Sequence, residues 1–273
     1  MGAEEKQSIK VIGKAMQILD LFTIEDPALT LNQITERLGQ KKTTIYRILD
    51  TLVDLELLEK DEQSKQYHLG LGILKYSTVV LHHMKLRRIG TKYTSELSKL
   101  LGYTTNIGVL RDNSIVLIDV VRSIDLMRPM SSYMGFKDPI HCNAMGKIIL
   151  ACKTRMEAEA ILEARKPLKK YTEKTIADKD VLLEELKKWR RLGYAIETEE
   201  SMEGIQCIGM PIFDHSNNVI AAVSVSMSIN NAKRDIDADI VDKMFQTAAG
   251  ISVEMGCMNY YSTIESLKER RFD

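Results

Sequence analysis

The sequence has little cysteine and no long hydrophobic run. Among its 273 residues it has four cysteines: Cys142, Cys152, Cys207 and Cys257. None stands at the Cys-x-x-Cys spacing of a zinc ribbon or a thioredoxin motif, and scattered thiols suit a reducing compartment. The charged segment from Met1 to Lys10 contains no apolar core of a signal peptide, and no apolar run has the length of a membrane span. We therefore expect a soluble, cytoplasmic protein with no membrane partner.

The chain also lacks a net charge, because 38 Lys+Arg balance 38 Asp+Glu. This balance argues against binding of polyanions through bulk charge, so any nucleic-acid binding must come from a local patch. A content of 44% hydrophobic and 28% charged residues is typical of a globular chain. The length is sufficient for two domains of ordinary size.

Local signatures of catalysis are missing as well: there is no G-x-S-x-G, no H-E-x-x-H and no phosphate-binding glycine loop. Two hypotheses from single residues stay open. Cys207, His141 and Glu197 are of the types that form a nucleophile, a base and an orienting carboxylate. His141, Cys142 and Cys207 are of types that bind zinc. We expect no enzyme activity, no cofactor and no metal, and keep a cytosolic enzyme using Cys207 and His141 as the alternative.

Two short helices joined at Gly39 are predicted between Leu31 and Leu55, the second of them from about Lys42. Ile34 and Leu38 are four residues apart and share one helix face. On the second helix the apolar residues follow helical spacing: Ile45, Ile48, Leu49 and Leu52. Thr30 is placed to cap the first helix, with Gln33 at the spacing of a capping box. A preceding helix is predicted from Val11 to Phe22, with Val11, Ala15, Ile18, Leu19 and Phe22 on one apolar stripe.

The second of these helices is basic on its polar side. Between Arg37 and Leu49 the sequence has four basic residues and no acidic one. Such side chains suit phosphates and base edges. The predicted DNA contacts are Lys41, Lys42, Thr43, Thr44, Tyr46 and Arg47. A module of the same shape used only for protein contacts is the alternative.

A hairpin with a polar tip is predicted after this helix, with strands at Leu57–Lys60 and Gln66–Leu69. A helix-turn-helix followed by a hairpin forms a winged helix, and we expect Lys65 at the tip to reach the DNA backbone or the minor groove. Acidic residues on the hairpin restrict that contact because they repel phosphates. We assign residues 1–70 to a winged helix-turn-helix domain, 71–88 to a linker helix and 89–273 to a second domain.

The second domain alternates strand and helix patterns. Strands are predicted at 105–110, 115–121, 194–199, 205–213 and 219–228, with helices at 143–152, 156–164, 178–192 and 237–255. This order indicates an α+β domain with a largely antiparallel sheet. Before these elements the pattern is helical from Leu71 to about Leu101, and we expect a linker helix that ends near Arg88 and a helix of the second domain that starts after Gly90. Lys85, Arg87, Arg88 and Lys92 form a basic cluster in the middle of this stretch, for which a solvated helix face is the alternative.

Two segments of the second domain could form a binding pocket. Asn143 is a plausible helix cap, the unpaired N–H groups after it favour an anion, and small Ala144 and Gly146 would let a ligand approach the backbone. Farther on, Ser224, Ser226 and Ser228 share one face of a strand. That face is either exposed or the polar floor of a pocket, beside which Cys207 and Glu197 could lie.

Taken together, these motifs resemble the isocitrate-lyase-regulator (IclR) family of transcription factors over nearly the whole chain. The matching segments are Tyr46-Arg47-Ile48-Leu49, Tyr67-His68-Leu69-Gly70, His141 to Lys147, Gly193-Tyr194 and Ala221 to Ser226. The resemblance implies a winged helix-turn-helix, a linker helix and a GAF-like effector domain. It also implies a homodimer or homotetramer, a double-stranded DNA operator and an organic or aromatic acid as effector.

By this resemblance the effector pocket comprises Met127, Met130, Asp138, Ala144, Glu197, Ile205, Cys207, Ser224 and Ser226. Two departures from the family pattern argue against a very small, strongly anionic effector. Asp138 puts a carboxylate where an apolar wall is usual, and Asn143-Ala144-Met145 is bulkier than the usual turn. We expect a ligand-responsive repressor of transcription. A GAF-like sensor that acts through protein partners is a further alternative.

Overall fold

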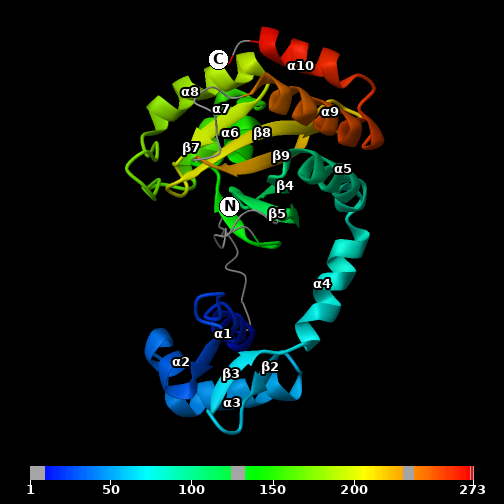
Figure 1. Cartoon of the computed structure of the whole chain (residues 1–273). Coiled ribbons are helices and arrows are strands. Elements are labelled where there is room, and N and C mark those ends of the chain that lie inside the picture. Colours follow the sequence, from blue (N-terminus) through cyan, green and yellow to red (C-terminus); the bar gives the residue numbers. More distant parts are fainter. Residues whose placement is uncertain (1–9, 124–132, 230–236, 271, 273) are drawn as a thin grey trace, which may run out of the picture. The chain divides into compact units, whose positions relative to one another are not determined.

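The computed structural model describes residues 10–123, 133–229, 237–270 and 272. The chain divides into two compact units, Met1–His83 and Met84–Asp273 (Figure 1). Met127 and Met130, two of the predicted pocket residues, lie outside the described residues. No helix in the described part of the chain is long and apolar enough to cross a membrane.

Three helices build the core of the N-terminal unit: α1 (Lys10–Leu19), α2 (Leu31–Leu38) and α3 (Lys42–Asp54). Ile18, Ile34 and Ile45, one from each helix, are fully buried. The predicted apolar stripe of the first helix is wrong at its start, because Val11 is 62% exposed. The helix also ends at Leu19, although Phe22 beyond it still packs into this core.

The predicted capping box of α2 is confirmed. Thr30 Oγ1 accepts from the backbone N–H of Gln33, while the Gln33 side chain accepts from the backbone N–H of Thr30. Gly39 ends the helix in the left-handed conformation at φ 59°. Glycine adopts this conformation without a steric cost, so the turn into α3 is set by local chemistry.

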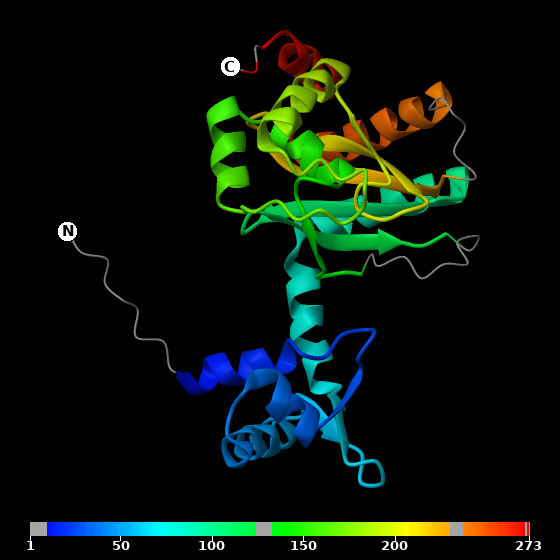
Figure 2. The ribbon, with the colours of Figure 1, turned by 90° about the vertical axis from the view of Figure 1, so that its left-hand side faces the viewer.

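The hairpin of the winged helix consists of β2 (Leu58–Lys60) and β3 (Gln66–Leu69), and β3 also pairs with β1 (Ala28–Thr30). All pairs are antiparallel. Figure 2 shows the hairpin loop extending from the helices of this unit. Its tip is shaped by Asp61, whose carboxylate accepts from the backbone N–H groups of Gln63 at 2.9 Å and Ser64 at 2.6 Å.

The predicted linker helix ends earlier than Arg88. The structure contains α4 (Gly72–His83) and α5 (Lys85–Leu101), with a break at Met84. Burial explains the difference, because Leu86 packs into the core of the second unit and a Cβ at Gly90 would lie 2.2 Å from the Ile107 side chain. Within the predicted basic cluster, Arg87 pairs with the buried Asp119 at 3.8 Å. The cluster is therefore not simply a solvated helix face.

The C-terminal unit contains a six-stranded antiparallel sheet in the order β6-β5-β4-β9-β8-β7. Its strands are β4 (Thr104–Arg111), β5 (Ser114–Val121), β6 (Lys137–Pro139), β7 (Ala195–Thr198), β8 (Ile205–Phe213) and β9 (Val219–Ser228). Its remaining helices are α6 (Ala144–Ala151), α7 (Arg155–Glu163), α8 (Lys179–Leu192), α9 (Ala238–Glu254) and α10 (Tyr260–Glu269). Neither β6 nor α10 was predicted from the sequence.

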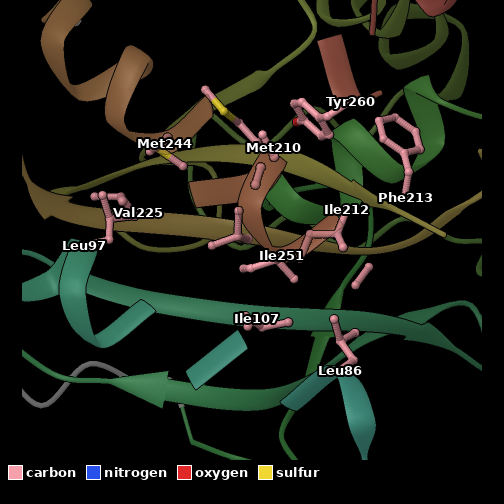
Figure 3. Packing of buried hydrophobic residues seen from close by; sticks show 14 of the residues in the cluster. Leu86, Leu97, Ile107, Met210, Ile212, Phe213, Val225, Met244, Ile251 and Tyr260 are labelled. Atoms are coloured by element: carbon pink, nitrogen blue, oxygen red, sulfur yellow. The ribbon is translucent and has the colours of Figure 1, made fainter. Parts of the chain in front are cut away.

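The two faces of this sheet are covered by different helices. On one face, residues of α5, α9 and α10 pack with Val223, Val225 and Met227 of β9 (Figure 3). The other face is covered by α6, α7 and α8. Since side chains alternate along a strand, Ser224 and Ser226 face the side of α6. The polar side of β9 is therefore buried rather than exposed.

Candidate functional site

The polar side of α3 is open to solvent in the N-terminal unit. Tyr46 is 47% exposed, and Lys41, Lys42, Thr43 and Arg47 are also exposed, while Thr44 is half-buried. Lys41, Lys42 and Arg47 form no ion pair with another residue in the described part of the chain. By contrast, Arg37 on α2 pairs with Asp26 at 2.9 Å. Three unpaired cations along one helix make a surface complementary to phosphate groups.

The wing contributes less charge than the sequence suggests. Lys65 lies at φ 56° at the tip, and its Nζ is 2.8 Å from Glu62. Lys60 lies 3.8 Å from the same carboxylate. A contact between Lys65 and a phosphate would have to replace an existing ion pair, so we expect the wing to contribute less affinity than α3.

A cavity of about 250 Å³ lies in the C-terminal unit, between the sheet and the start of α6. We call it the α6 cavity. All seven described residues of the predicted effector pocket line it: Asp138, Ala144, Glu197, Ile205, Cys207, Ser224 and Ser226. Ten further residues line it: Asn106, Leu117, Phe136, Pro139, Cys142, Asn143, Met145, Tyr171, Ser201 and Met202. The seven predicted residues come from five elements, β6, α6, β7, β8 and β9, so only the tertiary fold brings them together.

Strand register explains how the polar floor of the cavity forms. Glu197 on β7 is opposite Cys207 on β8, which is opposite Ser226 on β9. Directly opposed residues of an antiparallel pair project to the same face. The Cys207 Sγ lies 3.3 Å from the Ser226 Oγ. The Glu197 carboxylate accepts from the backbone N–H of Glu200 at 3.0 Å and from the Ser201 hydroxyl at 3.2 Å.

Asn106 on β4 belongs to this floor and was not predicted from the sequence. It pairs in register with Ser224, and its Nδ2 lies 3.3 Å from the Oγ atoms of both Ser224 and Ser226. The sequence contained one indication of this role, because an asparagine inside a predicted strand is unusual. Its partner could not be known, since the pairing of β4 with β9 joins segments more than a hundred residues apart.

The start of α6 closes the cavity against the sheet. Asn143 is confirmed as the N-cap, since its Oδ1 accepts from the backbone N–H of Gly146 at 2.6 Å. The expectation that Gly146 lets a ligand approach is wrong. A Cβ there would lie 2.0 Å from the Ile140 carbonyl oxygen, so Gly146 is needed for close packing of backbone on backbone. Ala144 does line the cavity.

The cavity contains carboxyl groups without a compensating cation. No lysine, arginine or histidine is among its described lining residues. Burial raises the pKa of Asp138 to about 6. Burial also raises the pKa of Glu197 to about 7, opposed in part by its hydrogen bond from the Glu200 backbone. Both carboxyl groups therefore change charge close to neutral pH.

The geometry does not favour Cys207 and His141 as a nucleophile and a base. The Nε2 atom of His141 is 2.9 Å from the Lys169 carbonyl oxygen, which engages that nitrogen in a structural hydrogen bond. Burial raises the pKa of Cys207 far above that of an ordinary thiol, whereas a nucleophilic cysteine needs a lowered one. Within the described ranges, no group of three His, Cys, Asp or Glu side chains is arranged to hold a metal ion.

Comparisons with known proteins find a matching domain family for each of the two units. Residues 11–62 match the family model described as IclR helix-turn-helix domain, and residues 78–253 match Bacterial transcriptional regulator IclR C-terminal. The transcriptional regulator KdgR of Escherichia coli is 31% identical over 257 residues, which covers 94% of this chain and 97% of KdgR.

Two solved structures show the same fold. The Thermotoga maritima IclR structure matches with a TM-score of 0.74 and 28% sequence identity. The match covers 91% of this chain and 100% of the Thermotoga chain. An IclR homolog from Microbacterium hydrocarbonoxydans, complexed with 4-hydroxybenzoate, has a TM-score of 0.77 and 20% identity, with 90% and 98% coverage. With two domain models matched in order and a relative aligned over almost its full length, this chain belongs to the IclR family of helix-turn-helix transcriptional regulators.

Proposed function

We propose that this protein is a repressor whose binding to a DNA operator is controlled by a small molecule held in the α6 cavity. The main support for the proposal is the cavity itself. Its floor is formed by polar residues of four strands, and its walls are apolar. Pockets of this composition bind small molecules in an orientation set by a few polar groups. The regulator with bound 4-hydroxybenzoate supports a small-molecule effector. An organic acid stays a prediction for this chain.

The proposed DNA contacts are the exposed residues of α3 together with Lys65 of the wing. The proposed effector contacts are the seven predicted residues that line the α6 cavity. An effector can change operator affinity only if it binds two states of the protein with different affinity. We propose that the two states differ in how an oligomer presents its α3 helices to DNA.

An apolar surface on the N-terminal unit supports the proposed oligomer. Helix α4 has no buried residue, and Leu74, Val79 and Val80 are each 59% exposed. On α1, Val11 and Ile12 are more than 60% exposed. Several exposed aliphatic side chains on short helices mark interaction surfaces. We propose that a second copy of the chain covers them, and that Val79→Glu shifts the protein toward monomer in sedimentation.

Fluorescence anisotropy tests the regulator function directly. The labelled DNA is the region upstream of the protein's own gene, with a scrambled fragment as control, and the titration is repeated over a salt series. We expect tight binding to the first fragment only, weakening as salt increases. Release of that DNA by a compound that also raises the melting temperature would support the effector site. Equal, weak binding to both fragments, and to fragments from neighbouring genes, would contradict the proposal.

A further inference from the structure

The hairpin of the wing has three acidic residues in different surroundings: Glu59, Asp61 and Glu62. The Glu59 carboxylate accepts from the backbone N–H of Leu71 at 3.1 Å. The Asp61 carboxylate accepts from the two backbone N–H groups that shape the tip. Both of these carboxylates therefore support the backbone. Glu62 differs, because its carboxylate contacts no backbone N–H in the part of the chain that the structure describes.

Glu62 instead joins the two lysines of the hairpin. Its Oε2 atom lies 2.8 Å from Lys65 Nζ, and its Oε1 atom lies 3.8 Å from Lys60 Nζ. The hydrogen bond from Lys65 lowers the pKa of Glu62, so the carboxylate is ionised at neutral pH. We call Lys60, Glu62 and Lys65 the wing latch. Their side chains are 30% to 75% exposed, and exposed ion pairs add little to stability, so the fold does not explain the latch.

The backbone conformation at Lys65 is a second sign that charge matters at this tip. Lys65 has φ 56°, in the left-handed region that glycine occupies without a steric cost. Glycine would therefore suit this turn better than lysine does. The chain has a cation at a position where the backbone favours another residue, and it pairs that cation with Glu62.

The wing latch lies beside the exposed face of α3. This helix packs on β2, the strand that leads to the tip. Burial raises the pKa of Tyr67 on β3, and the charges of Tyr46, Asp50 and Glu62 raise it further. Since Tyr46 and Asp50 belong to α3, the Tyr67 hydroxyl is close to both the helix and the latch. DNA bound to the exposed face of α3 would therefore meet the latch.

We propose that the wing latch is an autoinhibitory contact, which lowers the affinity of the protein for DNA of any sequence. This inference rests on the proposed contact between the wing and DNA. The chain has no net charge, so its attraction to DNA must come from local cations. The cations of α3 are unpaired, whereas Glu62 holds both lysines of the wing. Binding then depends more on α3, which can contact base edges, and less on backbone contacts that carry no sequence information.

Anisotropy titrations of the full chain on the scrambled DNA fragment test the proposal at several salt concentrations. Glu62→Gln removes both ion pairs, so we expect binding to tighten about three- to tenfold at about 50 mM salt, with a steeper dependence on salt. Glu203→Gln is the matched control, because Glu203 is exposed in the C-terminal unit and the change in net charge is the same. It should leave the affinity unchanged. Equal affinities of Glu62→Gln and the wild type would overturn the proposal.

A second background separates the latch from simple repulsion between Glu62 and phosphate groups. In a protein with Lys60→Gln and Lys65→Gln there is no latch to open, so adding Glu62→Gln should tighten binding less than about twofold. An equal gain with and without the lysines would show that Glu62 acts through its own charge alone, and the proposal would fail.

Melting temperatures distinguish a latch from a structural ion pair. Glu62→Gln should shift the melting temperature by no more than about 3 °C, because the pairs are exposed. A much larger decrease would make Glu62 a structural residue and would contradict its role as a latch. Failure of the proposed function appears separately, as equal affinity of the wild type for the scrambled fragment and for every upstream fragment.

Discussion

The Nζ atom of Lys147 on α6 lies 2.9 Å from Oε2 of Glu185 on α8. The same ammonium group donates to Glu200, which follows β7. The Lys147 side chain is completely buried, so the ion pairs are shielded from water. They tie the helix that closes the α6 cavity to two other elements of the unit. We therefore expect the position of the cavity wall to depend on this lysine.

Replacing Lys147 by methionine should strongly destabilise the protein. The change leaves two partly buried carboxylates without their cation, and removing one partner of such a pair costs about 3–5 kcal/mol. Urea unfolding followed by circular dichroism measures this cost. Lys187→Met is the matched control, because Lys187 forms an exposed pair with Glu184 on α8. It should lose no more than about 1 kcal/mol. Similar losses in the two variants would show that burial of Lys147 does not matter.

Two glycine-to-alanine changes should have opposite effects on stability. A Cβ at Gly146 would lie 2.0 Å from the Ile140 carbonyl oxygen, so Gly146→Ala must displace backbone and should cost about 1–3 kcal/mol. Nothing lies within 4 Å of a Cβ at Gly13 on α1. Gly13→Ala should therefore stabilise its helix by about 0.5–1 kcal/mol. Chemical denaturation of each variant measures its change in the free energy of unfolding. A stabilising Gly146→Ala would contradict the packing described for α6.

The stability of the ligand-free protein should fall as the pH rises toward neutrality. Glu197 has an ordinary pKa of 4.5 when unfolded and about 7 when folded. Between these values the folded state retains a proton that the unfolded state has released, so stability decreases as pH increases through this window. Melting temperatures from pH 4.5 to 8 test the prediction. Glu197→Gln should flatten the decline, and an unchanged pH profile in that variant would assign the effect to other groups.

Arg47→Ala should weaken operator binding because it removes an unpaired cation from α3. If Arg47 contacts a phosphate, the slope of log affinity against log salt should decrease by about one. Anisotropy titrations at several salt concentrations measure the change. Lys99→Ala serves as control, since Lys99 is exposed on α5 in the other unit. Equal effects of the two substitutions would argue against α3 as the DNA-binding surface.

Ser226→Leu should abolish stabilisation by compounds that bind the α6 cavity. The leucine side chain occupies part of the cavity and removes a hydroxyl from its floor. Thermal-shift titrations with any compound found active on the wild type measure the loss. Ser228→Leu is a control on the same strand, because Ser228 does not line the cavity. A full response by Ser226→Leu would place the binding site elsewhere in the protein.

Several elements could be predicted because their causes are local. The capping box of Thr30 and Gln33, the turn at Gly39 and the cap at Asn143 all depend on residues within three or four positions of one another. The alternation of serine with apolar residues in β9 likewise gave the two faces of that strand. The break between the linker helix and the next helix was predicted near Arg88 but lies at Met84, since helical periodicity continues through this segment and only the burial of Leu86 distinguishes the two helices.

The sequence by itself determined the two-unit architecture, the helix-turn-helix and the residue types of the pocket, because periodicity, capping and motif order are properties of short segments. Only the tertiary structure decided which polar groups meet. Asn106 joins Ser224 and Ser226 through the β4–β9 pairing, and Asp138 reaches the cavity through β6, an edge strand too short to predict. Register between strands distant in sequence is set by packing on both sheet faces, and no local pattern encodes it.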